Sequence, residues 1–261
     1  MDLQLSGTVA LVTAASRGLG RAAAEALGAE GARVAIGARD VAALDDVAER
    51  IRTSGGEAFA RPLDLSDPAS VEALVADTIG KWGRIDALIA NAPGPKPGKV
   101  LDTSEDDWRE ALETNVLSMV RLVRCVAPVM RRQGAGRIVF ITTVGILISQ
   151  PGMVLSNATR MAVHGLAKTM ALELAPDGIL VNVICPGPIE TDRQAFLIAD
   201  TARQRGISED EATAVWLQDV PLRRMGRPED FGAIVAFLCS SACSFVTGAA
   251  IAVDGGKAKG Y

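Results

Sequence analysis

Three polar residues recur at intervals of four in the segment VLSNATRMAVHGLAK, residues 154–168. They are Ser156, Arg160 and His164, and His164 is the only histidine of the chain. The segment has the apolar spacing of an amphipathic helix, so residues four apart share one of its faces. A hydroxyl and a guanidinium group on one face could polarise a carbonyl group, and a histidine could exchange a proton near neutral pH. The three residues are therefore either a set of catalytic residues or the remains of such a set on a helix that no longer carries it.

A second candidate lies near the N-terminus, in the segment TAASRGLGRAAAEAL, residues 13–27. Gly18 and Gly20 stand where a short apolar run gives way to a helical pattern. Backbone N–H groups and the helix dipole at such a turn can hold the pyrophosphate of a dinucleotide. A tight turn between a strand and a helix also uses glycine for its geometry alone, so the glycines need support from other residues.

Two arginines support the dinucleotide interpretation. Arg17 lies in the glycine turn, and Arg39 follows the second apolar run in the segment IGARD. An acid at the end of this second strand favours NAD, whereas an arginine accommodates the 2′-phosphate of NADP. Ala38 occupies the acid position, and we expect Asp40 to cap the next helix. The sequence thus favours NADP(H) over NAD(H), against the alternative that both arginines are ordinary surface residues.

Short apolar runs alternate with longer amphipathic segments along the whole chain. Strands are predicted over residues 8–14, 33–38, 57–64, 85–91, 137–143, 179–185 and 249–255, and helices near 19–30, 40–54, 68–82, 105–133, 154–176 and 228–241. Strands that are apolar on both faces and separated by helices form a parallel sheet covered on both sides. We therefore predict an α/β fold: one doubly wound Rossmann domain over 1–261, a parallel seven-stranded sheet with helices on both faces, and a substrate flap at about 190–225.

The composition excludes several classes of protein. The chain has 27 basic and 31 acidic residues, a net charge of −4, and shows no basic run, so we expect no nucleic-acid partner. It has no signal-peptide pattern and no apolar run of the ~18 residues that cross a membrane. The four cysteines lack metal-ligand spacing, so we predict no metal site and a reduced, cytoplasmic protein.

The motifs taken together resemble the short-chain dehydrogenase/reductase family, and most of all its 3-oxoacyl-carrier-protein reductases. The resemblance covers essentially the whole chain and rests on TAASRGLG, LDLSD, IANAPG, ETNV, RIVFITTVG, AVHGLAK with the residues up to PGPIETD, PLRRMGRPEDFG and FVTGAAIAVDGG. It implies a homo-oligomer, a tetramer or dimer, that acts on a small molecule. It also implies a cofactor site made of Ala14, Ser16, Arg17, Gly18, Leu19, Gly20, Arg39, Asp64, Leu65, Asn91, Ala92, Arg160, Pro186, Gly187, Ile189 and Thr191.

The resemblance breaks at the residues that would do the chemistry. The family has an asparagine, a serine, a tyrosine and a lysine in its active site; the matching positions here hold Asn115, Thr143, Ser156 and Arg160. The family's first loop glycine is replaced by Ala14, so a methyl group must fit beside the nucleotide. The motif NNAG is replaced by ANAP, which puts Pro93 where the family has a glycine.

These replacements change what the helix can do. A tyrosine, with a free pKa of ~10, can protonate the alkoxide that forms when a carbonyl is reduced. The hydroxyl of Ser156 is a far weaker acid and can only hydrogen-bond the carbonyl. Arg160 could still hold the ribose of the nicotinamide, but its guanidinium group stays charged and cannot share a proton. Because general acid catalysis contributes about 10²–10⁴-fold, its loss predicts a slow enzyme unless another group supplies the proton.

Three other sources of the proton are open. Water held by Asn115 and the backbone is the first. His164 has a suitable pKa but lies ~12 Å along the helix from Ser156, so it more simply packs on this helix or at a subunit contact. Tyr261 is the only tyrosine of the chain and its last residue, and it could reach a neighbouring subunit or fray as a terminus.

The substrate side of the sequence is apolar. The segment VGILISQPGMV, residues 144–154, is almost wholly apolar, and the predicted flap adds Phe196, Leu197, Ile198, Val215, Trp216 and Leu217. Such a wall suits a hydrophobic or acyl substrate, or it packs the flap on the domain. Three functions stay open: an atypical NADP(H)-dependent oxidoreductase that interconverts a carbonyl and an alcohol, a non-redox isomerase or lyase on the same fold, and a non-catalytic NADP-binding protein.

Overall fold

Parallel strands form the centre of the computed structural model, which describes residues 2–259. The strands are β1 (Val9–Thr13), β2 (Arg33–Ala38), β3 (Glu57–Pro62), β4 (Ala87–Ala90), β5 (Gly136–Ile141), β6 (Ile179–Pro186) and β7 (Ala250–Val253). They make one seven-stranded sheet in the order β3-β2-β1-β4-β5-β6-β7, and every neighbouring pair is parallel. The predicted α/β class and doubly wound sheet are confirmed.

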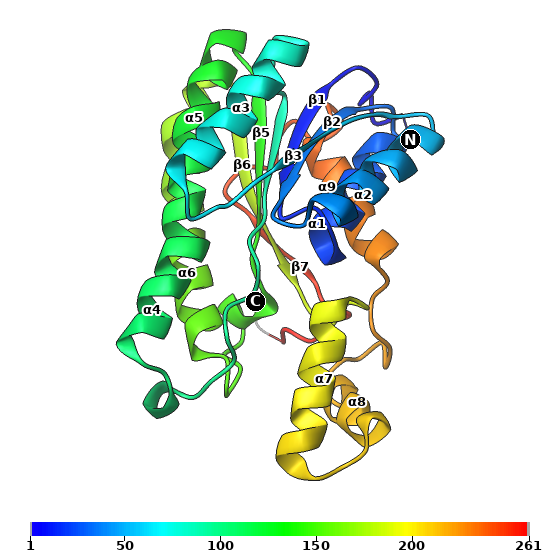
Figure 1. Ribbon diagram of the computed structural model, residues 1–261, viewed down its shortest axis with the longest axis vertical. Helices are drawn as coiled ribbons and strands as arrows, with labels where there is room; N and C mark the ends of the chain where they lie inside the picture. The colour runs from blue at the N-terminus through cyan, green and yellow to red at the C-terminus, as the bar shows by residue number, and fades with distance from the viewer. Residues whose placement is uncertain (1, 260–261) are drawn as a thin grey trace.

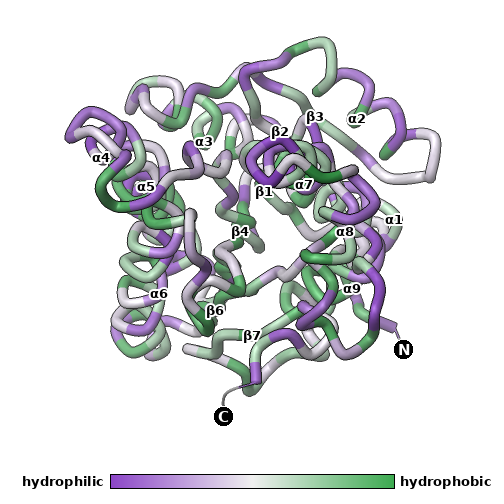
Figure 2. The backbone as a smooth tube through the Cα atoms, turned by 90° about the horizontal axis from the view of Figure 1, so that it is seen from below, coloured by the Kyte–Doolittle hydropathy of each residue, from purple (hydrophilic) through white to green (hydrophobic). Residues whose placement is uncertain are grey.

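Helices cover the sheet on both faces (Figure 1). They are α1 (Gly18–Ala29), α2 (Val41–Thr53), α3 (Pro68–Trp82), α4 (Glu105–Leu112), α5 (Ser118–Gln133), α6 (Val154–Leu174), α7 (Asp192–Arg205), α8 (Glu209–Leu217) and α9 (Pro228–Cys239). One core lies between the sheet and α3, α5 and α6, and the other between the sheet and α1, α2 and α9. Viewed along the sheet, these two groups of helices flank the strands on opposite sides (Figure 2).

Successive side chains of each central strand point to opposite faces of the sheet and so contribute to both cores. Leu11 of β1 belongs to the core under α3, α5 and α6, whereas its neighbours Ala10 and Val12 belong to the core under α1, α2 and α9. All three are buried, since successive side chains of a strand point to opposite faces of the sheet. Continuous apolar runs are therefore what this covered parallel sheet requires.

The strand order reverses between β1 and β4, and this reversal positions the site. Because β1 pairs with β2 on one side and with β4 on the other, the loops after β1 and β4 diverge to opposite faces. A crevice opens at the carboxyl ends of the two strands, where doubly wound sheets bind their ligands. The two loops are tied together there: Thr13 Oγ1 donates to the backbone oxygen of Asn91 at 2.6 Å and accepts from its N–H at 2.9 Å.

The helix predicted over residues 105–133 is wrong as one continuous α-helix. The structure divides it into α4, a π-helical turn η2 (Glu113–Leu117) and α5. A π-turn adds one residue to the turn while the chain stays helical, so the apolar periodicity gave no sign of it. Such turns often occur at functional sites, and this one contains the buried Asn115.

Helices α7 and α8 form the segment predicted as a flap, and they project beyond the carboxyl ends of the strands (Figure 1). The hydroxyl of Thr191 caps α7 by accepting from the N–H of Gln194 at 3.2 Å. A small apolar cluster of Ile198, Ala202 and Ala212 joins the two helices. Ile198 therefore packs the segment on itself rather than facing a ligand.

Within residues 2–259, no helix is long and apolar enough to cross a membrane. In the same range, no cluster of three or more His, Cys, Asp and Glu side chains is arranged to hold a metal ion. Cys125, Cys185, Cys239 and Cys243 are free thiols, and all but Cys125 are buried.

Candidate active site

A cavity of about 850 Å³ lies at the carboxyl ends of the central strands. Its lining comes from the loops after β1, β2, β3, β4, β5 and β6, from η2, and from the starts of α6 and α7. The lining includes Ala14, Ser16, Arg17, Gly18, Leu19, Arg39, Asp64, Leu65, Asn91, Ala92, Asn115, Thr143, Ser156, Arg160, Pro186, Gly187, Ile189 and Thr191. The fold thus brings together every cofactor-site and active-site residue that the family resemblance implies, except Gly20.

Gly20 does not line the cavity but packs against two residues that do, Ala14 and Asn91. A Cβ atom at this position would lie 2.3 Å from the backbone oxygen of Ala14 and 2.9 Å from Asn91 Nδ2, so no larger residue fits. This close approach lets α1 begin directly under the loop that follows β1. Gly18, with a φ of +56°, adopts the left-handed backbone that glycine tolerates best.

Ala14 has an unusual backbone for its residue type. Its φ is +49°, in the left-handed region that L-residues with a side chain rarely adopt. Its backbone oxygen accepts a hydrogen bond from Asn91 Nδ2 at 3.3 Å, which helps to hold the loop against the end of β4. The methyl group lines the cavity without closing it.

Arg17 and Arg39 lie at one end of the cavity, and both side chains are exposed. As expected, Asp40 caps α2: its carboxylate accepts from the N–H of Ala43 at 3.2 Å. Asp64 faces the same end. Its Oδ1 accepts from the Ser66 hydroxyl at 2.6 Å and from the Ser66 N–H at 2.9 Å, and these two bonds lower the pKa of the carboxyl group. Its Oδ2 is left to face a ligand.

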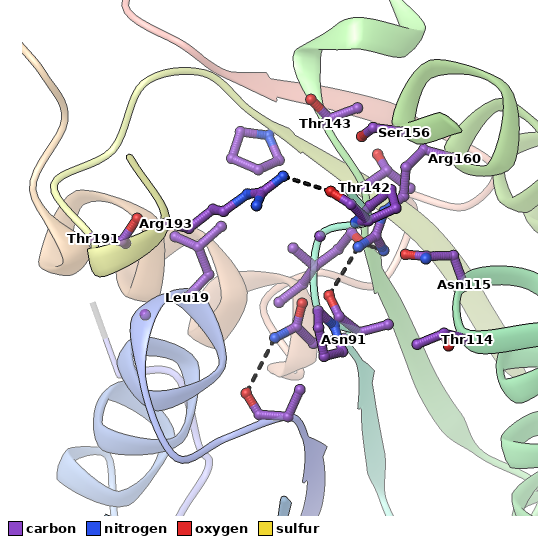
Figure 3. A pocket seen from close by; sticks show the side chains of 18 of the residues that line it. Leu19, Asn91, Thr114, Asn115, Thr142, Thr143, Ser156, Arg160, Thr191 and Arg193 are labelled. Atoms are coloured by element: carbon purple, nitrogen blue, oxygen red, sulfur yellow. Dashed lines mark hydrogen bonds between the residues drawn. The ribbon is translucent and has the colours of Figure 1, made fainter. Parts of the chain in front are cut away.

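At the other end, Arg160 crosses the floor of the cavity from α6 (Figure 3). One of its terminal nitrogens donates to the backbone oxygen of Ile141 and the other to that of Ala92, each at 2.8 Å. The guanidinium group therefore joins the ends of β5 and β4. Two of its five N–H donors are used in this way, which leaves three for a ligand.

Burial changes the electrostatics of Arg160. The residue is 4% exposed, and loss of hydration together with the nearby charge of Arg193 lowers its pKa to about 10. A group with this pKa stays protonated at neutral pH. The cavity floor thus holds a fixed positive charge whose charged neighbour is another cation.

Two hydroxyl groups lie on one side of the cavity, above Arg160 (Figure 3). Ser156 comes from the first turn of α6 and is 8% exposed. Thr143 follows β5, and its Oγ1 accepts from the N–H of Gly145 at 3.2 Å. Because that bond uses an oxygen lone pair, the proton of the Thr143 hydroxyl remains available for a carbonyl oxygen of a ligand.

Asn115 lies on the other side of Arg160 from these hydroxyls (Figure 3) and has an acceptor atom without a partner. Its Nδ2 donates to the backbone oxygen of Ala111 at 3.2 Å, whereas its Oδ1 is buried and has no partner. A buried polar atom without a partner is costly, so Oδ1 is a natural site for a water molecule or a ligand donor. The π-turn brings this amide to the cavity wall.

The loop after β6 passes close to the backbone of Asp254 at Gly187. A Cβ atom there would lie 2.7 Å from the Cα of Asp254, so a glycine is required for the chain to pass. Pro186, Ile189 and Thr191 follow the same path along the cavity, and Thr191 also faces Gly18 across it. The loop therefore runs opposite the turn that begins α1.

The structure separates His164 from the other two members of its row. Ser156 and Arg160 line the cavity, whereas His164 does not belong to the lining. Burial lowers the pKa of His164, and the nearby Lys168 lowers it further, so its imidazole is neutral at pH 7. Tyr261 lies outside the described residues.

Sequence reasoning missed several polar residues of the lining, among them Arg193 and Gln194. Both follow Thr191 in the first turn of α7, where the sequence indicated only helical material of a flap. An arginine in such a segment looks like a solvated surface residue. What could have identified it is its place two residues after a predicted cofactor ligand. The missed lining also includes Thr114, Thr142 and Lys96.

The comparisons with known proteins agree with this architecture. Residues 13–258 match a family described as enoyl-(acyl carrier protein) reductase. The chain is 35% identical over 254 residues to a 3-oxoacyl-[acyl-carrier-protein] reductase of Synechocystis, with 97% of each protein covered. It is 33% identical to human dehydrogenase/reductase SDR family member 4, covering 97% of this chain and 88% of that protein. The chain belongs to the short-chain dehydrogenase/reductase family.

Solved structures show the same relationship. A variant of actinorhodin polyketide ketoreductase, solved with NADPH, superposes with a TM-score of 0.93 at 33% identity and covers 97% of this chain and 98% of its own. The L-sorbose reductase of Gluconobacter frateurii, solved with NADPH and L-sorbose, gives 0.94 at 29% identity with full coverage of both chains. This short-chain dehydrogenase/reductase therefore shares its fold with reductases that bind a nicotinamide cofactor.

Proposed function

We propose that this protein is an NADP(H)-dependent oxidoreductase that interconverts a carbonyl and an alcohol on an apolar or acyl substrate. The observation that carries the proposal is the single continuous cavity, with a phosphate-binding turn and arginines at one end and two hydroxyl groups over a buried guanidinium at the other. The membership of the family supports the oxidoreductase class.

The lining residues fit a dinucleotide. The turn at Gly18, closely packed through Gly20, presents backbone N–H groups to a pyrophosphate at the start of α1. Asp64 Oδ2 can accept from an adenine amino group. Proline and glycine at positions 186 and 187 shape the loop beside the nicotinamide, and Arg160 keeps three donors for its ribose. The bound cofactor would supply or accept a hydride ion.

Arg17 and Arg39 are proposed to select NADP(H). Both are exposed at the adenosine end of the cavity, and Asp40, which also borders the cavity, uses its Oδ1 to cap α2. An acidic residue that would repel a 2′-phosphate is therefore missing from the place where NAD-specific proteins use one, because Ala38 stands there. Similar structures include both cofactors: L-sorbose reductase was solved with NADPH and a 7α-hydroxysteroid dehydrogenase with NADH. The proposed choice of NADP(H) therefore rests on the two arginines.

The proton step is proposed to differ from the family pattern that the sequence resemblance implies. Ser156 and Thr143 stand where that pattern has tyrosine and serine, and Arg160 stands in place of lysine. In our proposal the two hydroxyls hydrogen-bond the carbonyl, and a water molecule on Asn115 Oδ1 delivers the proton. Since a positioned acid contributes about 10²–10⁴-fold, we expect slow turnover.

The substrate is proposed to be apolar on the side away from the cofactor. Phe196, Leu197 and Trp216 of the flap line the cavity, and Val144 and Met153 line it from the segment after β5. Ile198, Val215 and Leu217, which the sequence grouped with them, are not part of the lining. The apolar wall is thus shared between α7, α8 and the loop before α6.

The first experiment is a titration of NADPH and NADH followed by a substrate panel. NADPH should bind more tightly than NADH, and Arg39→Ala should weaken NADPH binding about 10–100-fold, the value of a charge-assisted contact, without changing NADH binding. Arg50→Ala, an exposed arginine of α2 outside the cavity, is the matched control and should change neither. NADPH oxidation is then followed over ketones, quinones and acyl thioesters.

Two outcomes would contradict the proposal. Tighter binding of NADH than of NADPH would contradict the proposal that Arg17 and Arg39 select NADP(H). Binding of NADPH without oxidation by any member of the panel would remove the redox function and leave a non-redox enzyme or a cofactor-binding protein.

A further inference from the structure

Arg193 extends from the first turn of α7 across the cavity (Figure 3). It points away from Leu19 of the phosphate-binding turn and toward the side that carries Thr142, Thr143 and Ser156. One terminal nitrogen donates to the backbone oxygen of Pro95 at 2.7 Å, and the guanidinium group lies 5.5 Å from the centre of the Phe196 ring. These contacts hold the group in place and use one of its five N–H donors.

Within residues 2–259, neither Arg160 nor Arg193 forms an ion pair with a carboxylate. Asp200, the acidic group that most affects Arg193, is bound by Arg203, and the charged neighbour of Arg160 is Arg193 itself. Of the acidic residues of the lining near this end, Asp107 binds Lys96 and Glu113 binds Arg121, whereas Glu110 and Asp192 form no ion pair with either guanidinium group. The buried Arg160 and the half-buried Arg193 therefore face one cavity without an ion-pair partner, an arrangement that favours the binding of an anion.

Gln194 provides an independent sign of a ligand at the same place. The residue is 7% exposed and lines the cavity, and its Nε2 is buried with no hydrogen-bond partner. An amide Nε2 is purely a donor, so its missing partner is an acceptor such as a carboxylate oxygen. The unused donors of Arg193 and Gln194 come from adjacent residues of one turn of α7.

We infer that Arg193, with Gln194, recognises a carboxylate group of the substrate, so that this site prefers keto acids or hydroxy acids to neutral ketones and alcohols. The inference rests on the proposed oxidoreductase function and adds the charge of its substrate. The planar guanidinium fork matches a carboxylate with two parallel hydrogen bonds. The carbonyl to be reduced then lies toward Ser156 and Thr143, and the apolar wall of the flap covers the carbon chain between the two ends.

A phosphate of the cofactor is the other anion that could reach Arg193. The direction of the side chain favours the substrate, because the guanidinium group is on the Pro95 side of the cavity rather than beside the glycine turn. The two sources predict different losses in a variant of Arg193, which makes them separable by binding measurements.

The test uses β-benzoylpropionate, a keto acid, and its methyl ester as probes of the same shape. Their dissociation constants are measured by calorimetry on the whole protein, alone and with NADP⁺, so that no turnover is needed. We expect the acid to bind about 10–100-fold more tightly than the ester to the unmodified protein. Arg193→Gln should abolish this preference, Arg193→Lys should keep part of it, and Arg205→Gln, an exposed arginine at the other end of α7, should keep all of it.

The outcomes distinguish this inference from the proposed function. Equal binding of acid and ester to the unmodified protein, or a preference that survives in Arg193→Gln, would overturn the inference. If Arg193→Gln weakens NADPH binding and leaves the preference for the acid, the anion is a cofactor phosphate and the inference is also wrong. Failure of NADPH to bind at all would instead count against the proposed function, since the acid preference of the protein alone is measured separately.

Discussion

The alanine at position 14 carries backbone strain at the edge of the cofactor cavity. A left-handed φ costs an L-residue about 1–2 kcal/mol, whereas glycine adopts it freely but loses about 0.5–1 kcal/mol of backbone entropy on folding. We therefore expect Ala14→Gly to raise the free energy of unfolding by about 0.5–1 kcal/mol. Urea unfolding followed by circular dichroism measures this change.

The matched control for Ala14→Gly is a helical alanine. Ala76 is exposed within α3, where glycine should lower stability by about 0.8–1 kcal/mol. Equal losses at positions 14 and 76 would show that Ala14 is not strained and that its methyl group is well accommodated. The backbone angles predict that glycine raises the free energy of unfolding at position 14 and lowers it at position 76.

The contacts of some residues could be predicted from the sequence, and those of others could not. Asp40 was expected to cap a helix and does so, because a cap is set by residues only three positions away. The partners of Arg160 are the backbone oxygens of residues 19 and 68 positions away, so local pattern could not reveal them. Arg193 was missed for the same reason, since its position matters only once the flap has folded toward the loop after β4.

Among the elements, the tie between β1 and β4 is the contact that keeps the crevice in shape. Thr13 is fully buried, and its hydroxyl serves both the oxygen and the N–H of Asn91. Thr13→Val keeps the shape of the side chain and removes both bonds, which should cost about 1–3 kcal/mol of stability because backbone groups lose their partners. Thermal or urea unfolding provides the measurement.

Two variants control for this effect. Thr13→Ser retains the hydroxyl and should keep most of the stability. Thr53→Val removes an exposed hydroxyl of α2 that bonds the backbone oxygen of Glu49, and it should change stability by less than about 0.5 kcal/mol. A loss in Thr53→Val as large as that in Thr13→Val would contradict the special role of the tie.

Element boundaries were predictable where apolar periodicity and end signals agreed. The strand β2 and the helix α3 have the predicted bounds, and α3 begins at a proline after an aspartate cap and ends at a left-handed glycine. The π-turn within residues 105–133 was not predictable, because one extra residue in a turn leaves the apolar spacing almost intact. The helices of the flap were recognised only as helical material.

At the scale of the whole molecule, we expect a dimer or tetramer. Large apolar side chains stand exposed on the outer surface, among them Leu172 of α6, which is 79% exposed, and Phe245, which is fully exposed. Association would remove them from water, with a gain of about 25 cal/mol for each Å² of apolar surface. Analytical ultracentrifugation should give two or four times the mass of the chain, and Leu172→Glu should favour smaller species. A sedimenting species with the mass of one chain would contradict this expectation.

The position of Arg160 has a consequence for attempts to introduce at positions 156 and 160 the tyrosine and lysine that the family resemblance implies. A single ammonium group on a flexible stem cannot replace a planar fork that spans two strand ends, so Arg160→Lys should leave one of the carbonyls of Ile141 and Ala92 unbonded. Combining Ser156→Tyr with Arg160→Lys therefore disturbs the scaffold as well as the chemistry. A redesign first has to supply other hydrogen-bond donors for the carbonyls of Ile141 and Ala92 at the ends of β5 and β4. The proton donor can be exchanged after that.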